Sequence, residues 1–353
     1  MMMERLTRNR SRYQAQLLIA FAAVYLIWGS TYLAIRFAIE TLPGYSMSGA
    51  RFLLAGGGLY IYSRLRGAPR PTRRNWANAA LVGALLFLGG NGSVVWAEQR
   101  VPSGLAALLI ATEPLWIVLL FSFWRGGHKP SLRTALGIGL GFVGAAILSA
   151  PTSALGGEAP HLISMIVLVL AALSWATGSL YARGADLVEN PTQNAAMQMF
   201  TGSIFLLLAG TVAGEWAGFD LAAVSAKSAA AFFYLAIFGS LIGFSAYSWL
   251  LRNAHPAKVA TYAYVNPIIA VFLGWLLAGE PLGPRTMIAA ALILGSVILV
   301  SKAKESADVT TATAGCEAAC LEASGPLAEA AAEAAEAIRT ADRLADDERR
   351  VPA

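Results

Sequence analysis

The chain has 353 residues, of which 57% are hydrophobic and only 13% are charged, whereas an ordinary soluble domain has about 25% charged residues. A soluble core rarely grows beyond about 250–300 residues, so this composition argues against a soluble protein and predicts an integral membrane protein. The net charge of +5 does not indicate a nucleic-acid partner, because the basic residues stand between long apolar runs, where they orient helices in a bilayer.

Ten apolar segments have the length of about 20 residues that a membrane-spanning helix needs. We therefore predict an all-α integral membrane protein whose lipid-embedded part has ten transmembrane helices, separated by proline and glycine residues. We expect the first span to be retained, because it is longer than the apolar region of a signal peptide and nine more spans follow. The predicted spans are Ala15–Ala38, Tyr45–Arg64, Trp76–Ala97, Ser103–Trp124, Ser131–Ala150, His161–Arg183, Thr192–Gly214, Ser228–Leu251, Ala257–Ala278 and Pro284–Ser301.

Arginine and lysine residues gather in alternate loops. The even-numbered loops and the segments that directly flank the first and last spans hold 17 of them, and the odd-numbered loops hold 3. Because cytoplasmic loops carry the excess of cations, we expect both termini to face the cytoplasm. Residues 1–14 then form a basic cytoplasmic N-terminus.

The chain also resembles itself. Trp28 and Arg36 in the first span recur with the same spacing as Trp175 and Arg183 in the sixth. We predict two repeats, residues 15–150 and 161–302, with five spans each. Since five is odd, the second repeat enters the membrane from the opposite side, and the repeats are inverted. This architecture is typical of secondary transporters, which bind substrate near the midplane between the repeats.

An ionised side chain is costly in lipid, so three charged residues in or next to the predicted spans are candidates for charge pairing or proton binding. Glu113 lies about halfway along the fourth span and either binds a proton or a cationic substrate group, or accepts hydrogen bonds beside the kink at Pro114. Arg51 is expected to pair with Glu98 or Glu113. Glu98 closes the third span and is either part of a gate or solvated.

Aromatic and amide residues occur in the helices expected beside the repeat axis. They offer a small solute apolar area and a few hydrogen-bonding groups, although simple helix packing explains each of them singly as well. Together with the carboxylate in the fourth span, the candidate substrate-binding residues are Trp28, Tyr32, Asn91, Trp96, Glu113, Trp116, Trp175, Tyr181, Tyr247, Tyr262, Tyr264 and Asn266. We expect no metal, cofactor or catalytic residues, because the three histidines lie far apart at span edges.

Residues 303–353 form an acidic tail that holds 11 of the 21 Asp and Glu residues. Its alanine and glutamate content favours a soluble helix over Leu327–Arg350. We expect a cytoplasmic extension, either partly helical or disordered, or a weak helix for a partner protein. Cys316 and Cys320 are interpreted as incidental thiols of this tail.

Several motifs along residues 17–302 resemble the EamA family of the drug/metabolite transporter superfamily. The motifs are Tyr25-Leu-Ile-Trp28-Gly29-Ser30-Thr31-Tyr32, Arg51-Phe52, Gly90-Asn91-Gly92, Val101-Pro102-Ser103-Gly104, Glu113-Pro114, Tyr262-Ala263-Tyr264-Val265-Asn266-Pro267 and Gly279-Glu280. The resemblance implies a ten-helix exporter of the inner membrane whose cavity is lined by helices one, three, four, six, eight and nine.

Three functional hypotheses follow. The first is a secondary transporter that exports amino acids or similar small metabolites by alternating access, with possible proton coupling through Glu113. The second is efflux of lipophilic or quaternary-ammonium compounds, which aromatic rings can bind through cation–π contacts. The third, a membrane receptor or scaffold that acts through its tail, is remote because of the inverted repeat.

Overall fold

The computed structural model describes residues 2–123, 131–149, 161–254, 259 and 261–300. The acidic tail, with its predicted helix and two cysteines, lies outside the described residues. Within the described part every regular element is helical, which confirms the all-α prediction there.

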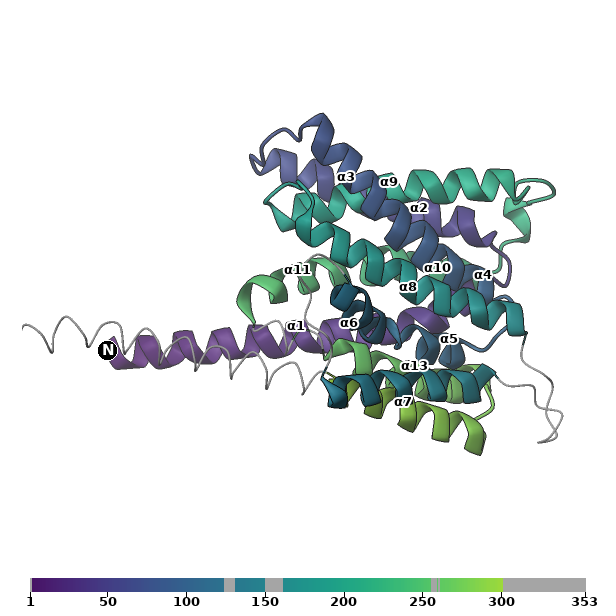
Figure 1. The fold of residues 1–353 in the computed structure, drawn as a ribbon. Helices are drawn as coiled ribbons and strands as arrows, with labels where there is room; N and C mark the ends of the chain where they lie inside the picture. Colours follow the sequence, from purple (N-terminus) through teal and green to yellow (C-terminus); the bar gives the residue numbers. More distant parts are fainter. Residues whose placement is uncertain (1, 124–130, 150–160, 255–258, 260, 301–353) are drawn as a thin grey trace, which may run out of the picture. The chain divides into compact units, whose positions relative to one another are not determined.

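The first half of the chain forms a series of helices (Figure 1). In order, the elements are α1 (Met2–Ala38), α2 (Gly44–Leu65), α3 (Arg73–Gly83), the π-helical stretch η1 (Ala84–Gly92), α4 (Ser93–Ala97), α5 (Ser103–Ile110), α6 (Glu113–Phe123) and α7 (Leu132–Ser149). The helix α1 runs through the predicted basic N-terminus without a break, since arginine is a good helix former.

The second half repeats this pattern. Its elements are α8 (Leu162–Gly184), α9 (Pro191–Val212), the short 3-10 turn η3 (Leu221–Ala223), α10 (Ala226–Tyr234), the π-helical stretch η4 (Leu235–Ile242), α11 (Gly243–Asn253), α13 (Tyr262–Ala278) and a last helix, Pro284–Val300. The two π-helical stretches occupy corresponding places, each inside the third predicted span of its half.

Helices fill most of the described part of every predicted span, but the fourth span is interrupted at residues 111–112. Six helices of the described residues are long and apolar enough to cross a membrane, and three shorter ones are apolar. The six are Tyr13–Ala38, Arg73–Ala97, Ser103–Phe123, Leu162–Gly184, Pro191–Val212 and Ala226–Tyr247. They indicate a membrane protein, whereas the number of ten spans and the orientation of the termini stay predictions.

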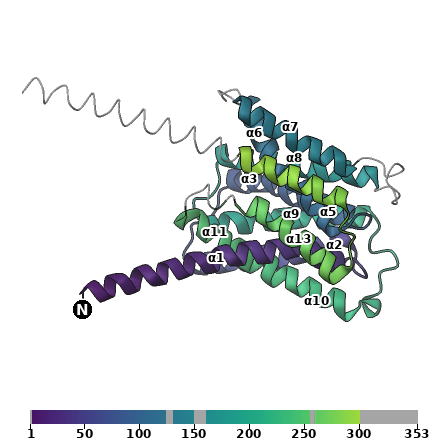
Figure 2. The ribbon, with the colours of Figure 1, turned by 90° about the horizontal axis from the view of Figure 1, so that it is seen from below.

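Helices of one half pack against helices of the other, and each of these contacts has a counterpart in which the two halves are interchanged (Figures 1 and 2). The first helix of the first half, α1, packs against α10, η4, α11 and α13. Correspondingly, the first helix of the second half, α8, packs against η1, α4, α5 and α6. In addition, α2 packs against α9, and α5 packs against α13. Each half therefore completes the core of the other.

Each π-helical stretch accepts a hydrogen bond from the first helix of the opposite half. Ser174 Oγ of α8 donates to the carbonyl oxygen of Leu85 in η1 over 2.8 Å, and Trp28 Nε1 of α1 donates to that of Gly239 in η4 over 3.1 Å. A side chain that inserts in this way stabilises a local departure from the α-helical ladder. At Gly90 a Cβ would lie 2.7 Å from Trp175 Cε3, so only glycine allows this approach.

Two glutamates cap helices to which they are not adjacent in sequence. The helices α2 and α5 each begin after a proline, Pro43 or Pro102, which offers no side-chain cap. The carboxylate of Glu215 accepts hydrogen bonds from Tyr45 N and Ser46 N, both over 2.8 Å, and from Ser46 Oγ over 2.7 Å. It thereby satisfies amide groups that the first turn of a helix leaves without a partner.

Glu280 repeats this arrangement at α5. Its carboxylate accepts hydrogen bonds from Ser103 N over 2.7 Å, Ser103 Oγ over 2.8 Å and Gly104 N over 2.9 Å. Both glutamates follow a glycine with positive φ, 73° at Gly214 and 64° at Gly279, the conformation that commonly ends a helix. We call Glu215 and Glu280 with the helix N-termini they cap the two carboxylate caps. They join α9 to α2 and α13 to α5.

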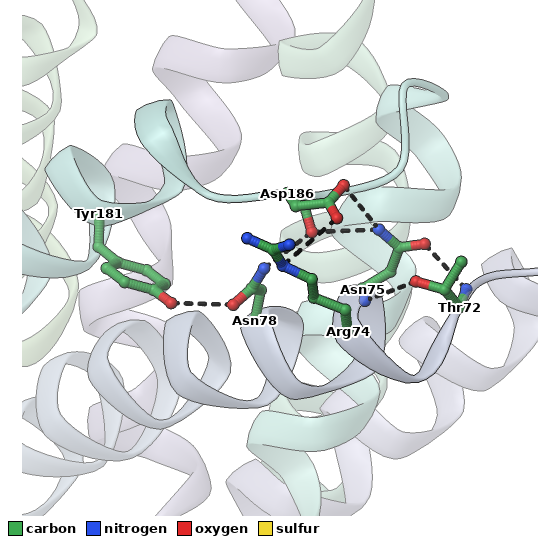
Figure 3. A network of polar contacts seen from close by, with 6 residues as sticks. All are labelled: Thr72, Arg74, Asn75, Asn78, Tyr181 and Asp186. Atoms are coloured by element: carbon green, nitrogen blue, oxygen red, sulfur yellow. Dashed lines mark hydrogen bonds and ion pairs between the residues drawn. The ribbon is translucent and has the colours of Figure 1, made fainter.

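A third polar contact joins α3 to the end of α8 (Figure 3). Thr72 and Asn75 form a reciprocal capping box at the start of α3. Asn75 Nδ2 also donates to the carbonyl oxygen of Asp186 over 3.1 Å, and Asn75 is only 7% exposed. By contrast, the ion pair between Arg74 Nε and Asp186 Oδ2 is 3.5 Å long, and its side chains are 78% and 52% exposed.

We expect Asn75→Ala to lower the free energy of unfolding by about 1–2 kcal/mol, because it removes the side-chain half of the capping box and the contact with Asp186. The control Arg74→Ala removes only an exposed ion pair and should change it by less than about 1 kcal/mol. Thermal unfolding of both variants in detergent tests the difference. A larger loss for Arg74→Ala would show that the ion pair holds α3 to α8.

Candidate functional site

A cavity opens among helices of both halves. Its lining residues come from α1, α2, η1, α4, α5, α6, α8, η4, α11 and α13. The cavity has a volume of about 130 Å³, close to the roughly 150 Å³ of an engineered cavity that binds benzene. Eight of the candidate residues from the sequence line it, namely Trp28, Tyr32, Arg51, Asn91, Glu113, Trp175, Tyr262 and Asn266.

Arg51 is the cation of this cavity. It lies on α2, is 3% exposed, and donates from Nη2 to Asn91 Oδ1 over 3.0 Å. Its guanidinium carbon lies 4.3 Å from the centre of the Phe52 ring. Its Nε forms no hydrogen bond with the described residues. Arg51 is therefore fixed on one side by Asn91, and it retains a free donor.

Glu113 is the anion of the cavity, and it lies at a break in the helix. Pro114 has no N–H to donate to the carbonyl oxygen of Ile110, so the ladder is interrupted there. Thr112 Oγ donates instead to the carbonyl oxygen of Leu109 over 2.7 Å. The helix α5 ends at Ile110 and α6 begins at Glu113. The break differs from the continuous span that the sequence predicts, and it places the carboxylate at a helix N-terminus.

Aromatic rings form one wall of the cavity. The ring of Trp28 is 5.2 Å from that of Phe244, 5.1 Å from that of Tyr247 and 5.4 Å from that of Tyr262. Its Nε1 is bound to Gly239, which fixes the indole plane. The wall therefore offers a rigid apolar surface to a ligand.

Asn266 and Ser240 add polar groups without partners. Asn266 Oδ1 and Ser240 Oγ are buried and form no hydrogen bond with the described residues. Both residues line the cavity, Asn266 from α13 and Ser240 from η4. A buried polar atom without a partner costs about 1–3 kcal/mol, so these atoms favour a ligand that bonds to them.

Three of the remaining candidate substrate-binding residues make contacts that are typical of helix packing. Tyr181 donates to Asn78 Oδ1 over 2.9 Å in the polar contact between α3 and α8 (Figure 3). The ring of Trp96 lies 4.7 Å below the guanidinium carbon of Arg100. Tyr247 packs behind the cavity wall, with its ring 5.7 Å from that of Tyr262. None of the three lines the cavity.

Three further candidates also lie elsewhere. The ring of Trp116 packs edge-on against Phe142 of α7 at 4.8 Å, and Tyr264 packs against the core cluster around Leu115. Glu98 is fully buried, and its carboxylate oxygens form no hydrogen bond with the described residues.

The predicted charge pairing of Arg51 is not formed. No ion pair within 4.0 Å joins Arg51 to Glu98 or Glu113 among the described residues, because its guanidinium is directed to Asn91. The cavity therefore contains a cation and an anion that do not neutralise each other by direct contact.

The sequence candidates omit several lining residues. Phe52, Phe87, Ser240 and Phe244 belong to the cavity wall. The spacing of four between Ser240 and Phe244 is a signal of one shared helix face, and Phe52 directly follows Arg51. In the described residues no group of three or more His, Cys, Asp or Glu could hold a metal ion.

Comparison with protein-family models identifies one family over most of the chain. The model of the EamA-like transporter family matches residues 15–150 and again residues 162–302. The chain is 39% identical over 297 residues to the uncharacterized inner membrane transporter YedA of Escherichia coli strain K12, covering 84% of this chain and 94% of that protein. It is 28% identical over 291 residues to a probable terminal-alkyne amino-acid exporter of Streptantibioticus cattleyicolor, covering 80% and 92%.

One solved structure supports the fold. It superposes with a TM-score of 0.55 at 20% sequence identity and covers 81% of this chain and 96% of that one. Within the family the resemblance is to the YedA type.

Proposed function

Because this chain belongs to the EamA-like transporter family, we propose that it exports amino acids or similar small metabolites across the inner membrane by alternating access. It is a multi-pass membrane protein, and its relatives are transporters of the inner membrane or exporters. The observation that carries the proposal is the cavity between the two halves, where an arginine and a glutamate that form no ion pair with the described residues lie beside an aromatic wall. Binding sites of secondary transporters lie in such a place.

The packing of the helices supports alternating access. Each first helix packs against the third and fourth spans of the opposite half, as two inverted five-helix repeats would. We propose repeats at residues 15–150 and 161–302, ten spans, and termini that face the cytoplasm. A rocking of one half against the other would then expose the cavity to each side in turn.

Glu113 is the proposed site of proton coupling. It is the carboxylate of the cavity, it starts a helix at a break, and no described residue forms an ion pair with it. Such a carboxylate can take up a proton on one side of the membrane and release it on the other.

A flux screen tests the proposed function. Purified protein is reconstituted in vesicles, and a panel of amino acids and related metabolites is measured with and without a pH gradient. We expect concentrative flux of at least one amino acid and a dependence on the gradient. A protein that moves none of the panel, while it retains its folded helical spectrum, would contradict the proposal.

The aromatic wall favours a second candidate, the efflux of lipophilic or quaternary cations, because Trp28 and Tyr262 can bind a cation through their ring faces. Glu113 would be the counter-charge. Competition separates the candidates: amino acids should slow the efflux of a cationic dye only if the two share the cavity. Dye efflux without amino-acid flux would favour the second candidate.

A further inference from the structure

We infer that the cavity recognises both charged ends of a zwitterion, with Arg51 and Asn91 binding a carboxylate and Glu113 and Asn266 binding an ammonium group. The inference rests on the proposed function and narrows its substrate to neutral amino acids. According to this inference, tight binding requires the carboxylate of the ligand. The proposed export of amino acids or similar metabolites and the proposed efflux of cations do not state such a requirement.

The carboxylate site is built from α2 and η1. Arg51 is 3% exposed and its Nε has no partner among the described residues, while Nη2 is held by Asn91 Oδ1. Because Asn91 uses its oxygen for Arg51, its amide NH2 is the group that it can offer to a ligand. Two residues on neighbouring elements thus direct only donors into this side of the cavity, which suits a carboxylate.

The ammonium site is built from α6 and α13. Glu113 presents a carboxylate, and Asn266 presents an oxygen that has no partner in the described part of the chain. The two residues hold corresponding places in the halves, since each directly precedes a proline, Pro114 or Pro267. Both also line a second, smaller cavity that adjoins Tyr32 and Tyr262. This side of the cavity therefore offers acceptors to an ammonium group.

The two sites together select against singly charged ligands. A lone cation that binds Glu113 leaves Arg51 buried without an anion, and a lone anion leaves Glu113 without a cation. Burial of an unpaired charge is costly, and a zwitterion satisfies both groups at once. The aromatic wall around Trp28 then receives an apolar side chain, and the volume of about 130 Å³ suits a small one.

Matched triplets test the inference. We choose alanine, valine, leucine and phenylalanine, and for each its amide, which lacks the carboxylate, and its deaminated acid, which lacks the ammonium group. Binding to the wild-type protein in detergent is measured by ligand-induced thermal shift. Competition against the amino acid carried in vesicles gives a second measure. We expect each amino acid to bind about ten- to a hundredfold more tightly than its amide or acid, the effect of one charge-assisted contact.

Variants of Arg51 test which end of the ligand this residue binds. Arg51→Gln should weaken amino-acid binding about ten- to a hundredfold while the amide is unaffected, so that the preference for the carboxylate disappears. Arg51→Lys keeps the charge but not the planar fork, and should lose part of that preference even if Arg51→Gln fails to fold. Arg66→Gln, on the exposed end of the same helix, is the control and should bind like wild type.

The outcomes separate the inference from the proposed function. Equal binding of amino acids and amides to wild type, or an equal loss of both in Arg51→Gln or Arg51→Lys, overturns the zwitterion site and leaves export standing. Selective binding of amino acids without flux in vesicles supports the zwitterion site and contradicts export. Preference for the amides over the amino acids overturns the inference in favour of a cation site.

Discussion

Glu113→Gln is expected to abolish the pH dependence of transport and to lower kcat/KM for an amino acid by about 10- to 100-fold, while the protein stays folded. The substitution keeps the shape of the side chain but removes its charge and its proton. The contact between a carboxylate and a ligand ammonium group is worth about 1.5–3 kcal/mol, which sets the size of the loss. Initial rates of flux in vesicles, measured across a range of pH, check both parts of this result.

Glu98→Gln is the matched control for this variant. Glu98 is also a buried glutamate and directly follows the third predicted span, but it does not line the cavity. Its substitution should leave the pH dependence of transport in place. If Glu113→Gln retains the wild-type pH profile, or Glu98→Gln loses it, the role of Glu113 as the coupling carboxylate is wrong.

A loss of stability of about 1–3 kcal/mol is expected for Glu280→Gln, because the neutral side chain offers one acceptor oxygen where the carboxylate offers two. The three hydrogen bonds from Ser103 and Gly104 cannot all be kept. The first turn of α5 also loses a negative charge at its N-terminus. The variant Glu215→Gln should lose a similar amount at α2, because the Glu215 carboxylate also accepts hydrogen bonds from two backbone N–H groups and one serine hydroxyl.

Thermal unfolding of purified variants measures this loss. Glu40→Gln is the control, because Glu40 forms an ion pair of 2.6 Å with Lys227 whose side chains are 42% and 50% exposed. Exposed ion pairs contribute little. A Glu280→Gln variant as stable as Glu40→Gln would mean that water caps α5 equally well.

The sequence predicts the cavity better than it predicts the contacts within it. Glu113, Arg51 and Asn91 can be recognised because polar groups inside apolar spans need a reason to be there, and all three line the cavity. The partner of Arg51 could not be predicted, since a carboxylate is the usual choice and the structure uses an amide. Tyr181 and Trp96 show that an aromatic residue with a polar group serves equally well in helix packing.

Local backbone geometry could not be predicted from the sequence either. Pro114 indicates a kink, but whether the helix continues depends on neighbours, and the chain breaks at Glu113 while α13 continues through Pro267. Glu215 stands in a predicted loop, where a charged side chain is normally solvated. Its role as a cap depends on the close packing of α9 against α2, which only the fold provides.

The two π-helical stretches also bear on how relatives are aligned. A π-helical turn holds more residues than an α-helical turn over a similar rise, so a stretch such as Ala84–Gly92 or Leu235–Ile242 contains more residues than an α-helix of the same length would. A related chain shorter by one residue can therefore omit it inside a membrane span and keep every loop length. An alignment of such a shorter relative should therefore place the gap inside the third or eighth span, because a gap forced into a loop would shift Asn91 or Ser240 out of register.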